Sequence, residues 1–370
     1  MEEVIIMGET NVSRRSFVIG MAAAVPALAL AGCGSEKKEA TEPASGKTAG
    51  LKSTSGKSMK VICTSEAYSK LFDKFSAETG AQPVEYISMS SGEALSRLRA
   101  EGGTPAADLW FGGGIDSFMS AASDGLLEKV QFDRASEFAT GFKSEGDLWF
   151  SKGSTVVGFL VNEAMLSQMG AKKPLAWADL VDPSYRDNIL MSSPAVSGTN
   201  YAVVNAILQT LGDEKGWAYF ASLNENIPYY TRRGSDPSTR VAAGEAAIGI
   251  TYLDRTLDEI LQNKDLSLVY PTDGIPYIPD GVAAFKGGED VEDAKLFIEW
   301  LFSSDENLKS LTEIDKKSTV LMSLPTVKGI ELDFDTSLLM DEDLELFGSQ
   351  RKSVLAKWEE VTSGKTVLEK

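Results

Sequence analysis

The sequence predicts an α/β protein with two lobes, each built from strands and helices that alternate along the chain. Two observations carry this prediction. Short aliphatic runs of strand length alternate with segments in which apolar residues recur every three to four positions, and glycine or small hydroxyl residues separate them. The chain is also 370 residues long, about the length of two ordinary domains. Alternation of this kind favours a parallel sheet covered by helices.

The first elements show how each expectation arises. Residues 60–64 read as a buried strand, and the following helix begins at Ser65 and ends at Gly80, a residue type that favours helix ends. Ser90 and Glu93 have the spacing of a capping box, which starts the next helix. The strands expected in the whole chain span residues 60–64, 84–88, 107–111, 155–161, 189–192, 228–231, 246–252, 266–270 and 282–285. Two later helices are expected, one from about Thr199 and one through Phe297, Trp300 and Leu301.

The N-terminus has the features of an export signal. Arg14-Arg15 precedes an apolar run over 17–30, which is shorter than the ~18 residues that a membrane-spanning helix needs. The paired arginines resemble a twin-arginine signal, and Leu30-Ala31-Gly32-Cys33 resembles a lipoprotein box. We therefore expect residues 1–32 to be a cleaved signal peptide and Cys33 to carry a lipid.

Residues 33–58 follow as a polar segment with no aromatic residue. Such a segment buries too little surface to offset the entropy of ordering, so it is expected to be a flexible tether. The protein is thus predicted to be exported and held at the membrane through the lipid on Cys33, as a cell-surface or periplasmic lipoprotein.

Composition excludes several classes of function. The formal charge is −18, from 36 basic and 54 acidic residues, and this argues against nucleic acid as a partner. The chain has no histidine and only two cysteines, so it lacks the residues for histidine-based catalysis, a Cys-rich zinc site or a disulfide framework. The G-x-S-x-G motif of serine hydrolases is absent. We expect no enzyme activity, no metal and no cofactor.

Several expected strands end in small hydroxyl or glycine residues: Thr64-Ser65, 88–92, 112–114 and 197–199. In open α/β sheets, ligands bind outside the carboxyl ends of the strands. Where a helix begins directly afterwards, its free N–H groups and positive dipole end favour an anion. These four strand ends are therefore candidates for one anion-binding site, although each is also compatible with a simple helix cap.

A series of short motifs then resembles one known family, the bacterial extracellular solute-binding proteins of ABC importers, in the group that includes ferric-ion and phosphorylated-solute binders. The resemblance runs from about Val61 to Trp358. The motifs that carry it are Met89-Ser90-Ser91-Gly92-Glu93, Ala107-Asp108-Leu109-Trp110-Phe111-Gly112-Gly113-Gly114, Trp177-Ala178-Asp179-Leu180, Asp182-Pro183-Ser184-Tyr185, Ser197-Gly198-Thr199, Val241-Ala242-Ala243-Gly244-Glu245 and Asp280-Gly281-Val282-Ala283.

The resemblance implies the type II periplasmic-binding-protein fold, with two hinged lobes and a solute cleft between them. It places 59–157 and 282–326 in the first lobe, and 158–281 and 327–370 in the second. The hinges are expected near 154–157 and 281–283. Closure on the solute would be a ligand-biased hinge movement, not a chemical step.

The resemblance leaves two classes of solute open. Ferric binders of the family place adjacent tyrosines where this chain has Asp254-Arg255, and Tyr229-Tyr230 lies upstream of that position. Neighbouring strand residues point to opposite faces, which disfavours both tyrosines on one ion. Ferric binding remains the alternative, since Asp254, Tyr252 and Tyr230 can supply oxygen ligands.

The leading prediction is capture of a small anionic solute that bears a phosphate, phosphonate or carboxylate, with an ABC permease as the membrane partner. An exported hydrolase that uses paired carboxylates is a third possibility. A monomer is expected. Two roles are open for Asp280: it could bind an amine of the ligand, or it could orient a hinge. The expected ligand-binding residues are Thr64, Ser65, Ser90, Ser91, Gly113, Ser197, Gly198, Thr199, Arg233, Ser235, Tyr252, Asp254 and Arg255.

Overall fold

The computed structural model describes residues 50–332, 334–363 and 365–368. The expected signal peptide, the expected lipid attachment site Cys33 and the rest of the tether up to residue 49 lie outside the described residues, so cleavage of the signal and lipid attachment stay predictions. Within the described part of the chain, every helix is too short or too polar to cross a bilayer.

The end of the expected tether is ordered against the first lobe, which corrects the sequence expectation for residues 51–58. Leu51 packs against the buried core of this lobe. The Ser53 amide donates to the Thr79 carbonyl at 3.1 Å, and the Ser53 hydroxyl donates to Asp293 at 2.7 Å. One packed leucine, one backbone hydrogen bond and one side-chain hydrogen bond therefore hold a segment that its composition alone predicts to be flexible.

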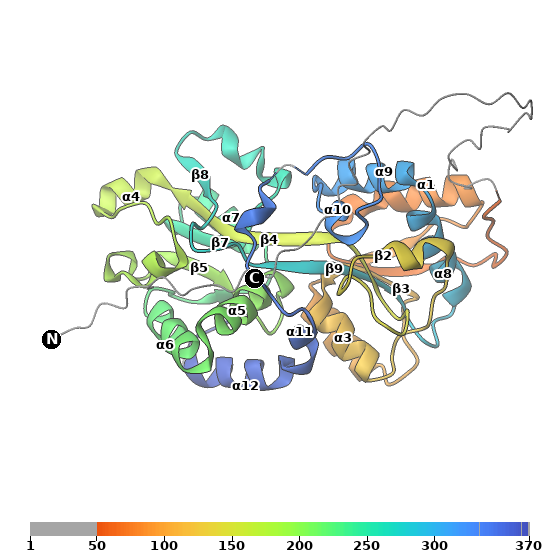
Figure 1. Cartoon of the computed structure of the whole chain (residues 1–370), viewed down its shortest axis with the longest axis horizontal. Helices are drawn as coiled ribbons and strands as arrows, with labels where there is room; N and C mark the ends of the chain where they lie inside the picture. The colour runs from red at the N-terminus through yellow and green to blue at the C-terminus, as the bar shows by residue number, and fades with distance from the viewer. Residues whose placement is uncertain (1–49, 333, 364, 369–370) are drawn as a thin grey trace, which may run out of the picture. The chain divides into compact units, whose positions relative to one another are not determined.

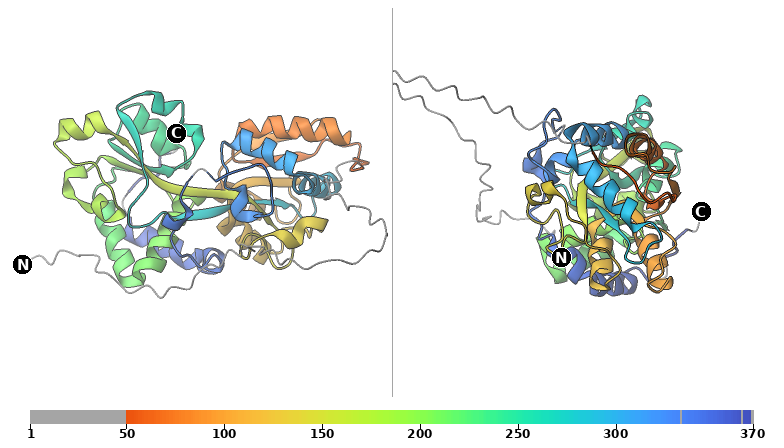
Figure 2. Two further views of the ribbon diagram at one scale, coloured as in Figure 1. Left: turned by 45° about the horizontal axis from the view of Figure 1, so that its top comes forward. Right: turned by 90° about the vertical axis from the view of Figure 1, so that its right-hand side faces the viewer.

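The first lobe begins with three parallel strands, and the chain crosses from one to the next through helices. α1 buries Leu71, Phe72 and Phe75 on one face and ends at Gly80, whose φ of 76° is the left-handed value that glycine accepts readily. Helices lie on both sides of the strands (Figures 1 and 2). The elements are β1 (Lys60–Cys63), α1 (Ser69–Thr79), β2 (Glu85–Ser88), α2 (Ser91–Ala100), β3 (Leu109–Gly114) and α3 (Ile115–Ser123).

Two long strands, β4 (Phe150–Asn162) and β9 (Tyr277–Ala284), connect the lobes. β4 pairs with β9 through Val156 and with β7 from Val157 onward, so it changes lobes between these two residues. All of β4 is buried, as expected for a strand with neighbours on both edges. The change of partner falls within the expected hinge at 154–157, and both strands begin five residues earlier than the sequence indicated.

The second lobe continues the same sheet, whose order is β2-β1-β3-β9-β4-β7-β5-β6, with β8 also paired to β4. α5 is buried along most of its length because it lies beside the strands that link the lobes. The elements are α4 (Glu163–Met169), β5 (Ile189–Ser192), α5 (Gly198–Leu211), α6 (Asp213–Asn224), β6 (Tyr230–Thr231), α7 (Asp236–Ala242), β7 (Ile248–Tyr252) and β8 (Leu266–Val269).

The last helices divide between the lobes. Trp358 on α12 contacts Phe220 and Tyr230 of the second lobe, as the expected boundary requires. α11 instead packs on α3 of the first lobe, where Gly348 approaches Met119. The described residues of 327–370 therefore contact both lobes. These helices are α8 (Val291–Ser303), α9 (Asp305–Asp315), α10 (Val320–Ser323), α11 (Glu345–Ser349) and α12 (Arg351–Val361). Short 3-10 turns complete the fold: η1 (Glu66–Tyr68), η2 (Asp133–Glu137), η3 (Trp177–Val181), η4 (Pro183–Tyr185), η5 (Arg255–Leu257), η6 (Ile260–Gln262) and η7 (Thr336–Leu338).

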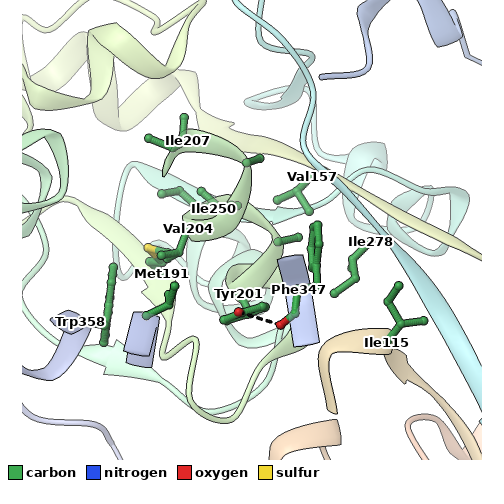
Figure 3. Close-up of a cluster of buried hydrophobic side chains, with 14 of the residues drawn as sticks. Ile115, Val157, Met191, Tyr201, Val204, Ile207, Ile250, Ile278, Phe347 and Trp358 are labelled. Atoms are coloured by element: carbon green, nitrogen blue, oxygen red, sulfur yellow. Dashed lines mark hydrogen bonds between the residues drawn. The ribbon is translucent and has the colours of Figure 1, made fainter. Parts of the chain in front are cut away.

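A core of buried side chains continues from the second lobe to α11. Figure 3 shows Val204 of α5 near Met191 of β5, and a dashed line joins Tyr201 to Phe347. The Tyr201 hydroxyl is fully buried and donates to the Phe347 carbonyl at 2.8 Å. This bond ties α5 to α11.

Replacing Tyr201 with phenylalanine should lower the free energy of unfolding by about 1–2 kcal/mol, because the Phe347 carbonyl loses its donor inside the core. Urea unfolding followed by circular dichroism measures this change. Tyr86→Phe is the matched control, since Tyr86 is 42% exposed and should change stability little. Equal stability of the two variants would contradict a structural role for this bond.

Candidate functional site

A cavity of about 300 Å³ lies between the lobes, at the carboxyl ends of several strands. Its wall contains hydroxyl groups, glycines, two tyrosines, one arginine, one lysine and three aspartates. The lining residues are Thr64, Ser65, Ala67, Tyr68, Met89, Ser90, Ser91, Gly113, Gly114, Thr155, Ser197, Gly198, Thr199, Arg233, Gly234, Ser235, Tyr252, Asp254, Thr256, Asp280, Ile314, Asp315 and Lys317.

One end of the cavity is formed by two helix starts that face each other across the lobes. Ser90 and Ser91 begin α2, and Ser197 caps α5, where its hydroxyl accepts the Asn200 amide. The two starts lie close together: a Cβ on Gly198 would be 3.1 Å from the Ser91 hydroxyl oxygen. First-turn amides have no partner within their own helix, and both dipoles direct positive potential here. This end is suited to an anion, and it is called the anion end below.

Arg233 adds a full positive charge to the anion end. Asp236 holds the backbone of this loop, because its carboxylate accepts the amides of Arg232 and Arg233 at 3.2 and 2.9 Å. The Arg233 guanidinium reaches across the cleft to the Ser88 carbonyl, 3.3 Å away. It therefore stands at the cavity wall with most of its donors available to a ligand.

Arg232 does not line the cavity, and it pairs with Glu93 of the other lobe. Its Nε lies 3.0 Å from Oε1 of Glu93 on α2, and the other Glu93 oxygen accepts the Ser90 amide and hydroxyl. Burial raises the pKa of Glu93, but the hydrogen bonds from Ser90 and Arg232 outweigh it and leave this pKa lowered. Glu93 thus stays ionised. It contacts both Arg232 of the other lobe and Ser90, the first residue of the helix start at the anion end.

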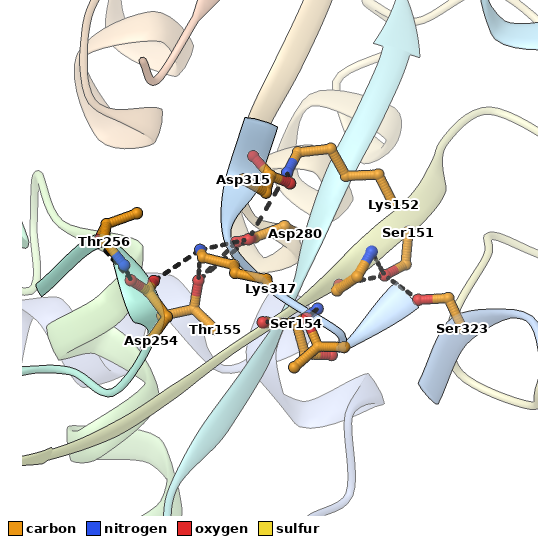
Figure 4. A network of polar contacts seen from close by, with 12 residues as sticks. Ser151, Lys152, Ser154, Thr155, Asp254, Thr256, Asp280, Asp315, Lys317 and Ser323 are labelled. Carbon is orange, nitrogen blue, oxygen red and sulfur yellow. Dashed lines mark hydrogen bonds and ion pairs between the residues drawn. The ribbon is translucent and has the colours of Figure 1, made fainter. Parts of the chain in front are cut away.

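The other end, called the acidic end below, contains a network of buried charges (Figure 4). The Lys317 ammonium lies 3.3 Å from Asp280, 3.5 Å from Asp254 and 3.1 Å from the Thr155 hydroxyl. Asp254 belongs to the second lobe, whereas Lys317 follows α9 on the first. Lys152 does not line the cavity, but its ammonium pairs with Asp315 at 2.8 Å.

The pKa shifts follow from this arrangement. Burial lowers the pKa of Lys317, but Asp280 and Asp254 outweigh it and the pKa is raised. The pKa of Lys152 is also raised, since Asp315 and Asp280 outweigh the effect of its burial. Burial raises the pKa of Asp254 despite the neighbouring Lys317. Both lysines are therefore fixed cations at neutral pH.

The structure brings together all of the expected ligand-binding residues except Arg255. Asp254 accepts the Thr256 amide and starts η5, and this turn directs Arg255 outward. The Arg255 side chain is 65% exposed and pairs with Asp258 at 3.5 Å. Its proposed place in the site is therefore corrected.

Sequence reasoning missed Lys317, Asp315 and Thr155, and it left the role of Asp280 open. Thr155 lies in the expected hinge and Asp280 in the Asp280-Gly281-Val282-Ala283 motif, and Asp315 and Lys317 share the segment at the end of α9. None of these positions marks a ligand contact in the sequence. They meet only because the linking strands and the end of α9 converge on the hinge. No local pattern signalled them.

The oxygen ligands considered for iron do not converge. The Tyr230 hydroxyl donates to Asn224, and neither Tyr229 nor Tyr230 lines the cavity. Over the described residues, no group of three or more His, Cys, Asp or Glu side chains has an arrangement that could hold a metal ion.

Comparisons with known proteins agree with this architecture. Residues 105–310 match the family model for bacterial extracellular solute-binding proteins. An uncharacterized Haemophilus influenzae protein is 30% identical over 306 residues, which cover 80% of this chain and 86% of that one.

Two solved structures share the fold. The periplasmic binding protein AfuA from Actinobacillus pleuropneumoniae, solved with fructose-6-phosphate bound, superposes with a TM-score of 0.74 at 29% identity, over 83% of this chain and 99% of that one. A ferric binding protein from Campylobacter jejuni superposes with a TM-score of 0.66 at 20% identity, over 82% and 99%, and this likeness concerns the fold alone. The expected type II periplasmic-binding-protein fold is confirmed.

The family model and the two solved structures are of solute-binding proteins, which agrees with the expectation that the protein is not an enzyme. The chain belongs to the bacterial extracellular solute-binding protein family, and it is the substrate-binding protein of an ABC importer.

Proposed function

We propose that this protein captures a small organic anion, bearing a phosphate, phosphonate or carboxylate, and delivers it to the importer. The observation that supports this most directly is the anion end of the cavity, where two helix starts and Arg233 converge. Arginine can grip a phosphate or carboxylate with two parallel hydrogen bonds. The solute would be the element that holds the two lobes closed.

Ferric ion is the weaker candidate. The Lys317 ammonium already lies between Asp254 and Asp280, where a metal ion would have to sit. An ammonium and a metal cation at one position repel each other, and Lys317 keeps its proton. The carboxylates of the cavity are thus engaged by a cation that belongs to the protein.

Attachment to the membrane through a lipid on Cys33 is a further part of the proposal. It rests on the sequence that ends in Leu30-Ala31-Gly32-Cys33 and on the polar segment that follows. The acidic protein would not bind an anionic membrane by its own charge, so a covalent lipid would supply the attachment. The tether would then extend from Cys33 to about residue 50.

Isothermal titration with 3-phosphoglycerate, fructose 6-phosphate and ferric citrate tests the proposed function. At least one phosphorylated solute should bind without being consumed, and Arg233→Gln should weaken its binding by more than about ten-fold, because charge-assisted hydrogen bonds contribute about 1.5–3 kcal/mol. Arg255→Gln is the matched control and should leave affinity unchanged, since Arg255 lies outside the cavity. Binding of ferric citrate alone, or equal effects of the two substitutions, would refute the proposal.

A further inference from the structure

One ion pair joins the two lobes outside the cavity. Arg232 follows β6 of the second lobe, and Glu93 lies in the first turn of α2 on the first lobe. The Arg232 Nε donates to Oε1 of Glu93 at 3.0 Å, and its Nη2 donates to the same oxygen. Neither residue lines the cavity, so the contact needs no atom of the solute. Arg232 and Glu93 are called the interlobe ion pair below.

Both members of the interlobe ion pair are held in position by contacts within their own lobes. The second oxygen of Glu93 accepts the Ser90 amide at 3.1 Å and the Ser90 hydroxyl at 2.8 Å. The Asp236 carboxylate accepts the Arg232 amide at 3.2 Å, which fixes the backbone from which the guanidinium extends. A partly exposed ion pair usually contributes little, because ordering two long side chains costs entropy. Here part of that order is already present within each lobe, so the pair stabilises contact between the lobes more effectively.

The interlobe ion pair acts at longer range than a neighbouring contact across the same boundary. Arg233 donates to the neutral Ser88 carbonyl at 3.3 Å, and such a hydrogen bond needs close approach. Two full charges instead attract each other over about 10 Å at about 0.1 M salt. The two lobes are linked by β4 and β9, so opening of the hinge separates the two charges. Their side chains are 37% and 26% exposed, which leaves the pair open to screening by salt.

We propose that the interlobe ion pair is a latch that favours the closed state by its own charge attraction, so that part of the protein closes before solute binds and ionic strength sets that fraction. This inference concerns hinge closure and does not depend on which solute is captured. A larger closed fraction raises the apparent affinity for any solute that needs the closed state. Arg232 and Glu93 are thus positioning residues that influence affinity from outside the cavity.

Small-angle scattering of the full chain without solute provides the test. We expect Arg232→Gln to raise the radius of gyration and to lower the ratio of closed to open molecules by about three- to five-fold, the upper range for a partly exposed ion pair. The effect should be present at about 0.1 M sodium chloride and absent at about 1 M, where the screening length falls to about 3 Å. Arg186→Gln is the matched control and should leave the scattering unchanged, since Arg186 pairs with Glu225 at 3.3 Å within the second lobe.

Two further variants separate the latch from a general effect on folding. Arg232→Lys keeps the charge and should recover part of the closed fraction at the lower salt concentration. Glu93→Gln combined with Arg232→Gln should open the protein no further than Arg232→Gln alone, because both substitutions remove the same interaction. The Arg232 variants alone decide the question if Glu93→Gln disturbs the start of α2.

Three outcomes overturn the latch. The first is an unliganded protein that is fully open at the lower salt concentration. The second is a closed fraction that is the same in Arg232→Gln and in the unmodified protein, and the third is an Arg232→Lys variant as open as Arg232→Gln. Each of these outcomes leaves the proposed function intact, since titration with solutes decides that function separately.

Discussion

Replacing Gly92 with valine should weaken solute binding by about 100-fold or more while leaving the separate lobes folded. Gly92 lies in the first turn of α2, and its amide donates to the Val196 carbonyl of the other lobe at 3.2 Å. A Cβ at this position would contact the Ala195 carbonyl oxygen and lie 2.7 Å from the Val196 Cα. These neighbours are backbone atoms, so they cannot rotate away as a side chain can.

The clash can be relieved by opening the hinge, because Gly92 belongs to the first lobe, whereas Ala195 and Val196 belong to the second. In such a variant, a smaller fraction of the molecules is closed, and part of the binding free energy is used to close the hinge. The apparent Kd therefore rises in proportion to the decrease in the closed fraction. A 100-fold loss corresponds to about 2.7 kcal/mol. Titration with a phosphorylated solute measures the loss, and small-angle scattering should show that solute no longer compacts the protein.

Ala100→Val is the control for this experiment, since it places the same side chain at the exposed end of the same helix. It should bind solute as the unmodified protein does. If Gly92→Val also bound normally, the contact between α2 and the Ala195–Val196 loop could not belong to the solute-bound state.

Replacing Lys152 with methionine should lower the free energy of unfolding by about 3–5 kcal/mol, because it leaves a buried carboxylate without its cation. Lys152 is 1% exposed in its side chain and lies 2.8 Å from Asp315. The folded state raises the pKa of Lys152 above its ordinary 10.5, since Asp315 and Asp280 outweigh its burial. Its contribution is therefore complete below pH 10.5 and is lost only as the pH rises through the folded-state pKa.

Urea unfolding near pH 7 measures this loss. The double variant Lys152→Met/Asp315→Leu should recover much of the stability, because a buried ion pair can be replaced by apolar groups of similar volume. A double variant no more stable than Lys152→Met would show that Lys152 acts through other contacts, such as its approach to the Tyr68 and Phe111 rings.

The fold could be predicted largely because its signals are local. Strands such as β1 and β5 are short aliphatic runs, and α1 carries its apolar stripe and its Gly80 terminus in the sequence itself. α3 was not expected, because three consecutive glycines conceal the point where β3 ends and the helix begins at Ile115. The ordered segment that begins at Leu51 was not predicted, because the residues that hold it lie far away in the chain.

The anion end of the cavity was also predictable from local sequence. Two helices begin directly after strands, at Ser90-Ser91 and at residues 197–199. Hydroxyl side chains at these positions cap the helix, and glycine lets a ligand approach the free amides. Arg255 was misplaced because exposure depends on the direction of one turn, which Asp254 sets by capping η5. The sequence of two adjacent charged residues does not indicate which of them faces a cleft.

The sequence by itself determined the α/β class, the alternation of elements, the absence of histidine chemistry and the helix starts suited to an anion. Only the tertiary structure decided the acidic end, where Lys152, Asp254, Asp280, Asp315 and Lys317 meet. The physical reason is distance along the chain: periodicity and capping act within a few residues, whereas these charges come from separate segments that the two linking strands bring within 4 Å of one another. Their pairing is a property of the folded molecule.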